Sequence, residues 1–216
     1  MPAVVENHGV RIRPVTPARL VAELTERIAA RPGWVRVAID GPDAAHPDEL
    51  ADALVGPLRA RGRPVVRVRA ADHLRPASLR LERGRENPDA FLDDWLDAEG
   101  LVREVLRPLD PGGTGRIRPV RFDAAADRAS RTPFITVAPG AVLLLSGPLL
   151  LGRGLPLDLT VHIVLTPAAL RRRTPAPWHW TLPAFARYEE EVNPASWADV
   201  VIRADDPRRP AIVERD

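Results

Sequence analysis

The chain has 216 residues, enough for one good hydrophobic core, and we expect a single domain over residues 1–216. It contains no cysteine, which excludes a disulfide framework and a thiolate metal site, and its net charge of +2 does not indicate nucleic-acid binding. The apolar runs are short and the N-terminus lacks a secretory signal pattern, so we expect a cytoplasmic protein that does not cross a membrane.

Hydrophobic periodicity in the first part of the chain predicts short strands that alternate with helices. Residues 1–15 are predicted to form a loose arm or an edge segment. The elements that follow are a helix that begins at Thr16–Pro17 and runs through Ala30, a strand over 35–39, a loop over 40–47, a helix over 48–61 and a strand over 65–70.

The remainder begins with a polar, arginine-rich connection from residue 71 and ends in further strands and helices. It predicts a helix over 89–107, a loop over 108–115, a half-buried strand over 116–122, a polar segment over 123–133, apolar strands over 141–145 and 159–165, a helix from 167, a Pro/Trp-rich loop over 175–183, a short helix over 182–192 and a last internal strand over 198–202.

This order predicts an α/β fold, a three-layer doubly wound and mostly parallel sheet of about five strands flanked by helices. Ligands of such sheets bind outside the carboxyl ends of the strands. We therefore expect one crevice to be formed by the strand ends at 40–41, 70–72, 146–147 and 166.

The loop after the first strand resembles a damaged phosphate-binding loop of the pattern G-x-x-x-x-G-K-[ST]. Gly41 holds the first glycine position, whereas His46, Pro47 and Asp48 replace the second glycine, the lysine and the hydroxyl residue. These substitutions remove a backbone donor, the charge that neutralises phosphate and the ligand of Mg²⁺. The simpler alternative is a strand-to-helix turn in which Asp48 is a helix-capping acid.

No lysine can be supplied from elsewhere, because all 31 basic residues are arginine. Any phosphate clamp must therefore use arginine, backbone N–H groups or a metal ion. The remaining residues of the chain do not show the spacing of metal ligands, so no metal site is predicted.

Several polar and aromatic residues have structural as well as functional interpretations. Asp72 is a turn residue or a functional acid at a strand end, and His162 is a hydrogen-bonded histidine of the core or of a sheet face. His46 is a solvent-facing turn histidine or an anion ligand. Trp178 and Trp180 stack on a base or cover the core.

Many segments in order and spacing make the chain resemble the uridine kinase and related nucleoside kinase group, in its actinobacterial form. The resemblance covers about residues 15–213. Its carriers are VRVAIDGPDAA, GRPVVRVRAADHLRP, LRLERGRENPDAF, LDDWLDAEGLVREVLRPLDPGG, RIRPVRFDAAADR, AVLLLSGPLLL, LTPAALRRR and ARYEEEVNPASWADVVIRADDP.

The resemblance implies roles for particular residues. Asp72 matches the base that accepts the proton of the nucleoside 5′-hydroxyl, and residues 71–115 match a helical insertion on the substrate side. The implied phosphate-loop remnant is Gly41, Pro42, Asp43, Ala44, Ala45, His46 and Asp48. The implied substrate-binding residues are Arg75, Arg83, Phe122, Asp123 and Arg128, and the implied lid, shortened over 171–192, carries Arg171, Arg172 and Arg173.

Three hypotheses follow. The first is a nucleoside kinase that uses ATP and Mg²⁺, with activity that is weak or lost because three loop residues are replaced. The second is a non-catalytic pseudokinase that binds a nucleoside, a nucleotide or a protein partner. The third is a different reaction in the same crevice. A homodimer is a further expectation.

Overall fold

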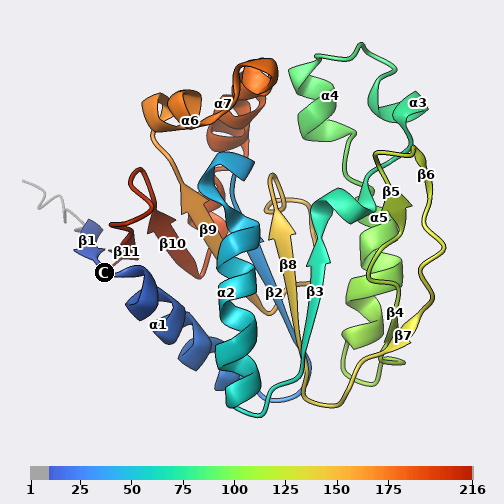
Figure 1. Ribbon diagram of the computed structural model, residues 1–216, viewed down its shortest axis with the longest axis vertical. Helices are drawn as coiled ribbons and strands as arrows, with labels where there is room; N and C mark the ends of the chain where they lie inside the picture. The colour runs from blue at the N-terminus through green and yellow to red at the C-terminus, as the bar shows by residue number, and fades with distance from the viewer. Residues whose placement is uncertain (1–9, 216) are drawn as a thin grey trace, which may run out of the picture.

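A mostly parallel sheet forms the centre of the molecule. In the computed structural model, which describes residues 10–215, this sheet has seven strands in the order β1-β11-β10-β9-β2-β8-β3 (Figure 1). Neighbouring strands from β10 to β3 are parallel, whereas β11 and β1 are antiparallel to their neighbours. The strands are β1 (Val10–Pro14), β2 (Val35–Asp40), β3 (Val65–Arg69), β8 (Val142–Gly147), β9 (Leu159–Val164), β10 (Val200–Arg203) and β11 (Ala211–Arg215).

Helices cover both faces of this sheet, which gives the three layers expected from the sequence. One face packs against α1 and α2, and the other against α7 and the helical run that begins with α5. The helices are α1 (Pro17–Ala29), α2 (Pro47–Ala60), α3 (Ala77–Arg80), α4 (Pro88–Asp93), α5 (Ala98–Leu101), α6 (Pro167–Arg173), α7 (Leu182–Glu191) and α8 (Pro194–Trp197). Within residues 10–215, no helix has the length and apolar character needed to span a membrane.

The central strands and the helix starts follow directly from the sequence. All six residues of β2 and all six of β8 are buried, as expected of strands covered on both faces. The hydroxyl of Thr16 accepts a hydrogen bond from the backbone N–H of Arg19, and that of Thr166 accepts one from Ala169. Each threonine precedes a proline, whose missing N–H costs nothing in the first helical turn.

The helix predicted over 89–107 is broken, and this prediction was wrong. After α4 the chain extends, so that Arg75 N–H bonds to Trp95 and Asp97 N–H bonds to His73. Asp97 then caps α5 by accepting a hydrogen bond from Gly100, and a π-helical turn (Val102–Leu106) and a 3₁₀ turn (Arg107–Leu109) follow. Pairing with residues 73–75 therefore outweighs the helical pattern.

The strand predicted over 116–122 is also interrupted. Arg116 and Ile117 form β4, which pairs with β7 (Ile135–Thr136), whereas Phe122 and Asp123 form β5, which pairs with β6 (Arg128–Ala129). Pro119 lies between them and has no N–H to donate to a ladder. Both small sheets lie outside the central sheet.

The edge of the central sheet differs from the prediction of about five strands. β11 was not predicted, and it lies between β1 and β10, so β10 is not the last internal strand. Residues 10–14 of the predicted N-terminal arm form the edge strand β1, and residues 1–9 lie outside the described residues.

A buried arginine joins β2 to the helical run on the far face. The Arg36 side chain is only 8% exposed and donates to both carboxylate oxygens of Asp158, at 2.9 and 3.0 Å. It also donates to the carboxylate of Asp110 and, at 3.3 Å, to the carbonyl of Leu106. Burial by itself raises the pKa of Asp158, but the hydrogen bonds from Arg36 outweigh it and lower the pKa.

We expect Asp158→Ala to lower the free energy of unfolding by roughly 3 kcal/mol, because it leaves the Arg36 charge buried with fewer partners. The control is Glu26→Ala, which removes the ion pair between Glu26 and Arg61, two side chains that are more than half exposed. Such a surface pair contributes about 1 kcal/mol or less. Urea unfolding of the two variants measures both effects, and equal losses would contradict the assignment.

Candidate ligand-binding crevice

The loop between β2 and α2 is tightly folded. A Cβ atom at Gly41 would lie 3.1 Å from Ile163, so this position favours glycine. A 3₁₀ turn (Asp43–Ala45) follows, and His46 then takes the left-handed conformation, with φ 57° and ψ 51°. A glycine adopts that conformation without strain, and His46 stands where the phosphate-loop pattern has its second glycine. The backbone at position 46 thus has a conformation suited to glycine, although the side chain is that of histidine.

Asp48 brings a negative charge to the first turn of α2. Its carboxylate accepts a hydrogen bond from the hydroxyl of Ser146, at the end of β8, and lies 3.6 Å from Arg67. Arg67 also donates to Ser146 at 3.0 Å and to Asp52 at 2.8 Å. Side chains of the protein itself therefore surround the turn that would face a phosphate, and Pro47 supplies no N–H there.

The last residue of β2, Asp40, anchors the loop from below. Its fully buried carboxylate lies 2.6 Å from Nδ1 of His162 on β9 and accepts hydrogen bonds from Tyr188 on α7 and from the N–H of Leu150. Burial by itself lowers the pKa of His162, but its contacts with Asp40 and Glu189 outweigh it and raise the pKa to about 9. The raised pKa keeps the His162 ring protonated beside the carboxylate of Asp40 at neutral pH. The prediction of His162 as a hydrogen-bonded core residue is confirmed.

Asp72 lies in the 3₁₀ turn (Ala70–His73) that follows β3. Its carboxylate makes no hydrogen bond or ion pair with other described residues, and its pKa is raised by burial and by Asp48, against the opposing effect of Arg69 and Arg67. Burial and Asp48 likewise raise the pKa of Asp43, whose side chain keeps contact with solvent. Three carboxylates therefore lie around the loop, an unfavourable setting for a triphosphate.

Aromatic side chains form the wall of a cavity beside these carboxylates. The cavity measures about 200 Å³ and is lined by residues that include Asp43, Ala71, Phe91, Trp95, Arg153 and Trp178. Trp178 is 48% exposed and also lines a neighbouring cavity of about 230 Å³ that reaches Pro42 and Thr174. The position of the Trp178 ring therefore sets how much space a ligand has between the loop and α4.

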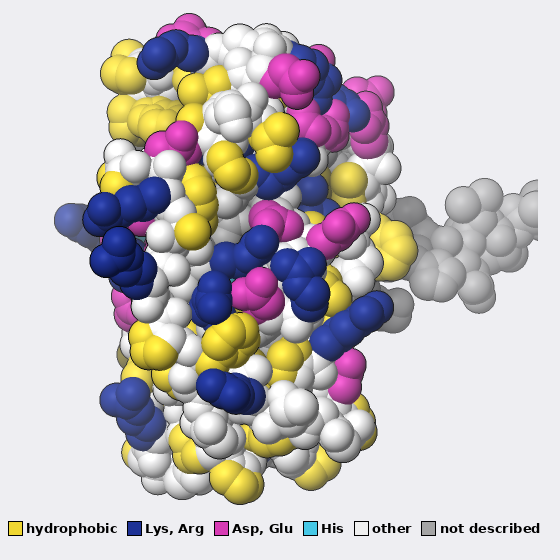
Figure 2. Space-filling view, turned by 90° about the vertical axis from the view of Figure 1, so that its right-hand side faces the viewer, with side chains coloured by type: hydrophobic (Ala, Val, Ile, Leu, Met, Phe, Trp, Pro, Cys, Tyr) yellow, Lys and Arg dark blue, Asp and Glu magenta, His cyan; other side chains and the backbone are white. Residues whose placement is uncertain are grey.

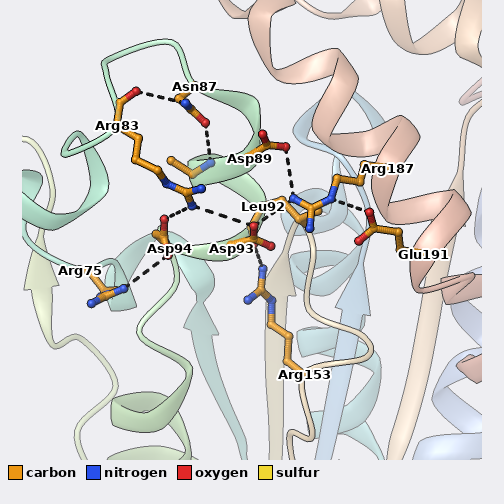
Figure 3. A network of polar contacts seen from close by, with 11 residues as sticks. Arg75, Arg83, Asn87, Asp89, Leu92, Asp93, Asp94, Arg153, Arg187 and Glu191 are labelled. Atoms are coloured by element: carbon orange, nitrogen blue, oxygen red, sulfur yellow. Dashed lines mark hydrogen bonds and ion pairs between the residues drawn. The ribbon is translucent and has the colours of Figure 1, made fainter.

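Arg153 brings a positive charge to this cavity. It donates to the carbonyl of Leu92 (Figure 3) and to that of Leu149 at 2.5 Å. It has no carboxylate partner among the described residues. Burial lowers its pKa. Because this half-buried guanidinium bonds only to carbonyl oxygens, it can still donate hydrogen bonds to an oxygen-rich ligand.

Arg75 and Arg83, predicted to bind substrate, face acids of the segment around α4. Arg75 lies 3.8 Å from Asp94, and Arg83 pairs with Asp94 and lies 4.0 Å from Asp93 (Figure 3). Arg187 on α7 bridges to the same segment through Asp89 and Asp93. This network joins α4 to α7, and the charges of Arg75 and Arg83 are largely matched within it.

The predicted residues of the 122–128 region lie in the β5–β6 hairpin. Phe122 is buried, Asp123 accepts a hydrogen bond from the N–H of Ala126, and Arg128 is exposed opposite Asp123. The hairpin is held against the Asp72 turn by a hydrogen bond from the N–H of Arg121 to the carbonyl of Asp72, at 3.0 Å.

The predicted lid arginines end helix α6. Arg171 and Arg172 are exposed, whereas Arg173 donates to the carbonyl of Ala204 at 2.8 Å. Positive side chains at this end complement the helix dipole, so their position is explained by helix stability as well as by ligand binding. Among residues 10–215, no group of three His, Asp or Glu side chains is arranged to hold a metal ion.

The comparisons with known proteins identify the fold. No protein-family model matches the chain, and no curated protein matches it. The chain is similar to the structure of a possible uridine kinase from Bacillus stearothermophilus, with a TM-score of 0.70, 21% identity and coverage of 85% of this chain and 97% of that one. The chain has a P-loop kinase-like fold.

A second solved structure agrees with this assignment. A proposed fructose transport system kinase from Silicibacter sp. TM1040 matches with a TM-score of 0.53, 22% identity and coverage of 84% of this chain and 93% of that one. At such identities the likeness concerns the fold alone. The predicted α/β class with a mostly parallel sheet flanked by helices is confirmed.

Three residues of the crevice were not identified from the sequence. Arg67 and Arg153 could not be distinguished from other arginines, because their importance depends on contacts with residues 79 and 61 positions away. Asp40 did give a signal, a carboxylate at the end of an otherwise apolar buried strand, with His162 inside another such strand.

The Asp40–His162 pair predicts a pH dependence of stability. Between pH 6.5 and about 9 the folded chain holds the His162 proton and the unfolded chain does not, so the free energy of unfolding falls as pH rises, by about 1.4 kcal/mol per unit. Urea unfolding across this range tests the slope, and His162→Gln should remove it. A wild-type stability that is constant over this window contradicts the prediction.

Proposed function

We propose that this P-loop kinase-like protein binds a nucleoside or a related hydroxyl-rich small molecule in its crevice and transfers phosphate from a nucleoside triphosphate weakly or not at all. The observation that carries the proposal is Asp48, a carboxylate held by Ser146 and Arg67 in the first turn of α2. The substrate side of the crevice has an acid, an arginine (Arg153) and aromatic walls. The phosphate side carries the negative charge of Asp48, which repels a phosphate group.

The expected loss in the rate of phosphoryl transfer can be estimated from the loop residues that are replaced. Catalysis of phosphoryl transfer is mostly positioning and electrostatic stabilisation, and removing one stabilising group commonly costs about 10²- to 10³-fold in rate. Here the lysine, the metal-binding hydroxyl and the second glycine are all replaced. The residues of the loop do not fit ATP with Mg²⁺, so we assign no step of a reaction to that pair.

The binding side is supported by chemistry suited to a nucleoside. Trp178 and Trp95 offer aromatic rings for a base, and Arg153 and Asp43 offer a donor and an acceptor for hydroxyl groups in the same cavity. Asp72 follows the lining residue Ala71 in the turn after β3. The possible uridine kinase to which the chain is similar makes a nucleoside the first ligand to test.

We expect nucleosides to raise the melting temperature of the protein, since a ligand that binds the folded state stabilises it by mass action. Trp178→Ala should weaken this binding about tenfold, because stacking of a base contributes about 1–3 kcal/mol. Trp197→Ala is the matched control, since Trp197 is 65% exposed on α8 and lines neither cavity of the crevice. Calorimetric titration with uridine, cytidine, adenosine and guanosine measures the effect; equal losses in both variants would refute a base site at Trp178.

We expect Mg²⁺–ATP to leave the melting temperature of the wild-type protein unchanged. The triple variant His46→Gly, Pro47→Lys and Asp48→Ser restores the phosphate-loop pattern and should gain a shift with Mg²⁺–ATP. Asp48→Ser alone is the control, because it removes the repelling charge without adding the lysine. A wild-type shift as large as that of the triple variant would contradict the loss of triphosphate binding.

A second candidate function, active phosphoryl transfer, is favoured by Asp72, whose carboxylate has no hydrogen-bond or ion-pair partner among residues 10–215 and whose pKa is raised by burial, as suits a general base. Release of ADP that depends on a nucleoside and is abolished by Asp72→Asn would establish this activity. Such a result would replace the non-catalytic proposal.

A further inference from the structure

A larger cavity lies on the other side of the loop from the aromatic crevice. It measures about 690 Å³ and opens between α6, α7 and the carboxyl ends of β9 and β10, which lie together in the upper part of the molecule (Figure 1). Its volume falls within the range of small-molecule sites. It shares no lining residue with the cavity of Trp95 and Arg153, and it adjoins the cavity of about 230 Å³ at Pro42 and Phe185.

Most of the cavity wall is apolar. The side chains of Ile163, Leu165, Leu170, Leu182 and Phe185 contribute to it, and prolines close it on two sides. Burying apolar ligand surface against such a wall is favourable at about 25 cal/mol per Å². The wall therefore suits an aromatic or aliphatic body rather than a sugar.

Two arginines bring positive charge to the same cavity. Arg171 is exposed and makes no ion pair with described residues, and Arg203 has only a distant carboxylate partner, Asp205, at 3.9 Å. The one lining carboxylate, Glu189, lies 3.4 Å from Nε2 of His162, and that nitrogen has no hydrogen-bond partner among the described residues. Asp40 lies against His162 behind the wall, so the charges of Arg171, Arg203 and Glu189 sum to +1. His179 also lines the cavity, and its Nε2 lies 2.9 Å from the carbonyl of Thr174.

We infer that this cavity binds a small molecule with an apolar body and a single anionic group, a carboxylate, sulfonate or phosphate monoester. The apolar body packs between α6 and α7, and Arg171 and Arg203 receive the anionic group. Lysine is absent from the chain, and a planar guanidinium binds such groups with two parallel hydrogen bonds.

The test uses a pair of fluorescent probes with the same apolar body. One is 8-anilinonaphthalene-1-sulfonate, which carries one anionic group, and the other is the neutral N-phenyl-1-naphthylamine. We expect saturable binding of the sulfonate at one site per chain, at least about tenfold tighter than the neutral probe, because a hydrogen bond to a charged group contributes about 1.5–3 kcal/mol. Equal affinity for the two probes would overturn the role of the arginines.

Variants locate the site. Arg171→Glu and Arg203→Glu should each weaken sulfonate binding about tenfold or more and leave the neutral probe unchanged. Arg172→Glu is the matched control, since Arg172 is the next residue of α6 but does not line this cavity. Ala186→Trp, a substitution at an exposed position of α7 that lines the cavity, should abolish binding of both probes.

Three further results separate this site from others. Trp178→Ala should leave sulfonate binding unchanged, which keeps the outcome independent of the proposed nucleoside site. Circular dichroism of each variant shows whether it is folded, and binding that persists in a folded Ala186→Trp variant would overturn the inference. Displacement of the sulfonate by Mg²⁺–ATP at stoichiometric levels would assign the cavity to a nucleotide and also overturn it.

Discussion

The crevice depends on the buried carboxylate of Asp40. It joins the end of β2 to β9 through His162, to α7 through Tyr188 and to the segment after β8 through the N–H of Leu150. An isolated charge in this position would cost several kcal/mol, and the neighbouring histidine proton and two further donors offset that cost. Because the loop begins at the next residue, its position is fixed by this network and does not require a bound phosphate.

At the start of α2, as at Asp40, a carboxylate has its partners within the chain. A phosphate loop leaves its donors and the positive end of its helix free for a ligand. In this chain Asp48 places a negative charge in the first turn of α2, where it accepts a hydrogen bond from Ser146 and lies 3.6 Å from Arg67. A triphosphate would therefore meet a carboxylate that the folded chain already holds at the positive end of the helix.

The sequence predicted the parts of the fold that depend on local pattern. The buried strands β2 and β8 and the helix starts at Thr16 and Thr166 follow from burial and capping, whereas the predicted single crevice is divided: Ala70 and Ala71 line one cavity and Thr166 lines another. The break before Asp97 could not be predicted, because it depends on pairing with residues 73–75. The positions of Arg153 and Arg67 at the site could not be predicted for a related reason, because their contacts are with residues distant in the sequence.

The two sides of the loop can change independently because different elements build them. The aromatic wall comes from α4, the residues just after it and the 3₁₀ turn (Ala176–Thr181) after α6. A salt-bridge network from Arg83 to Arg187 holds α4 against α7 and uses no residue of the loop between β2 and α2. The phosphate side is built mainly by β2, α2 and β8, with Arg67 of β3 against Asp48. Replacement of His46, Pro47 and Asp48 therefore leaves the contacts of the substrate side in place. A kinase-like fold can lose phosphate binding in this way and keep a pocket shaped for another ligand.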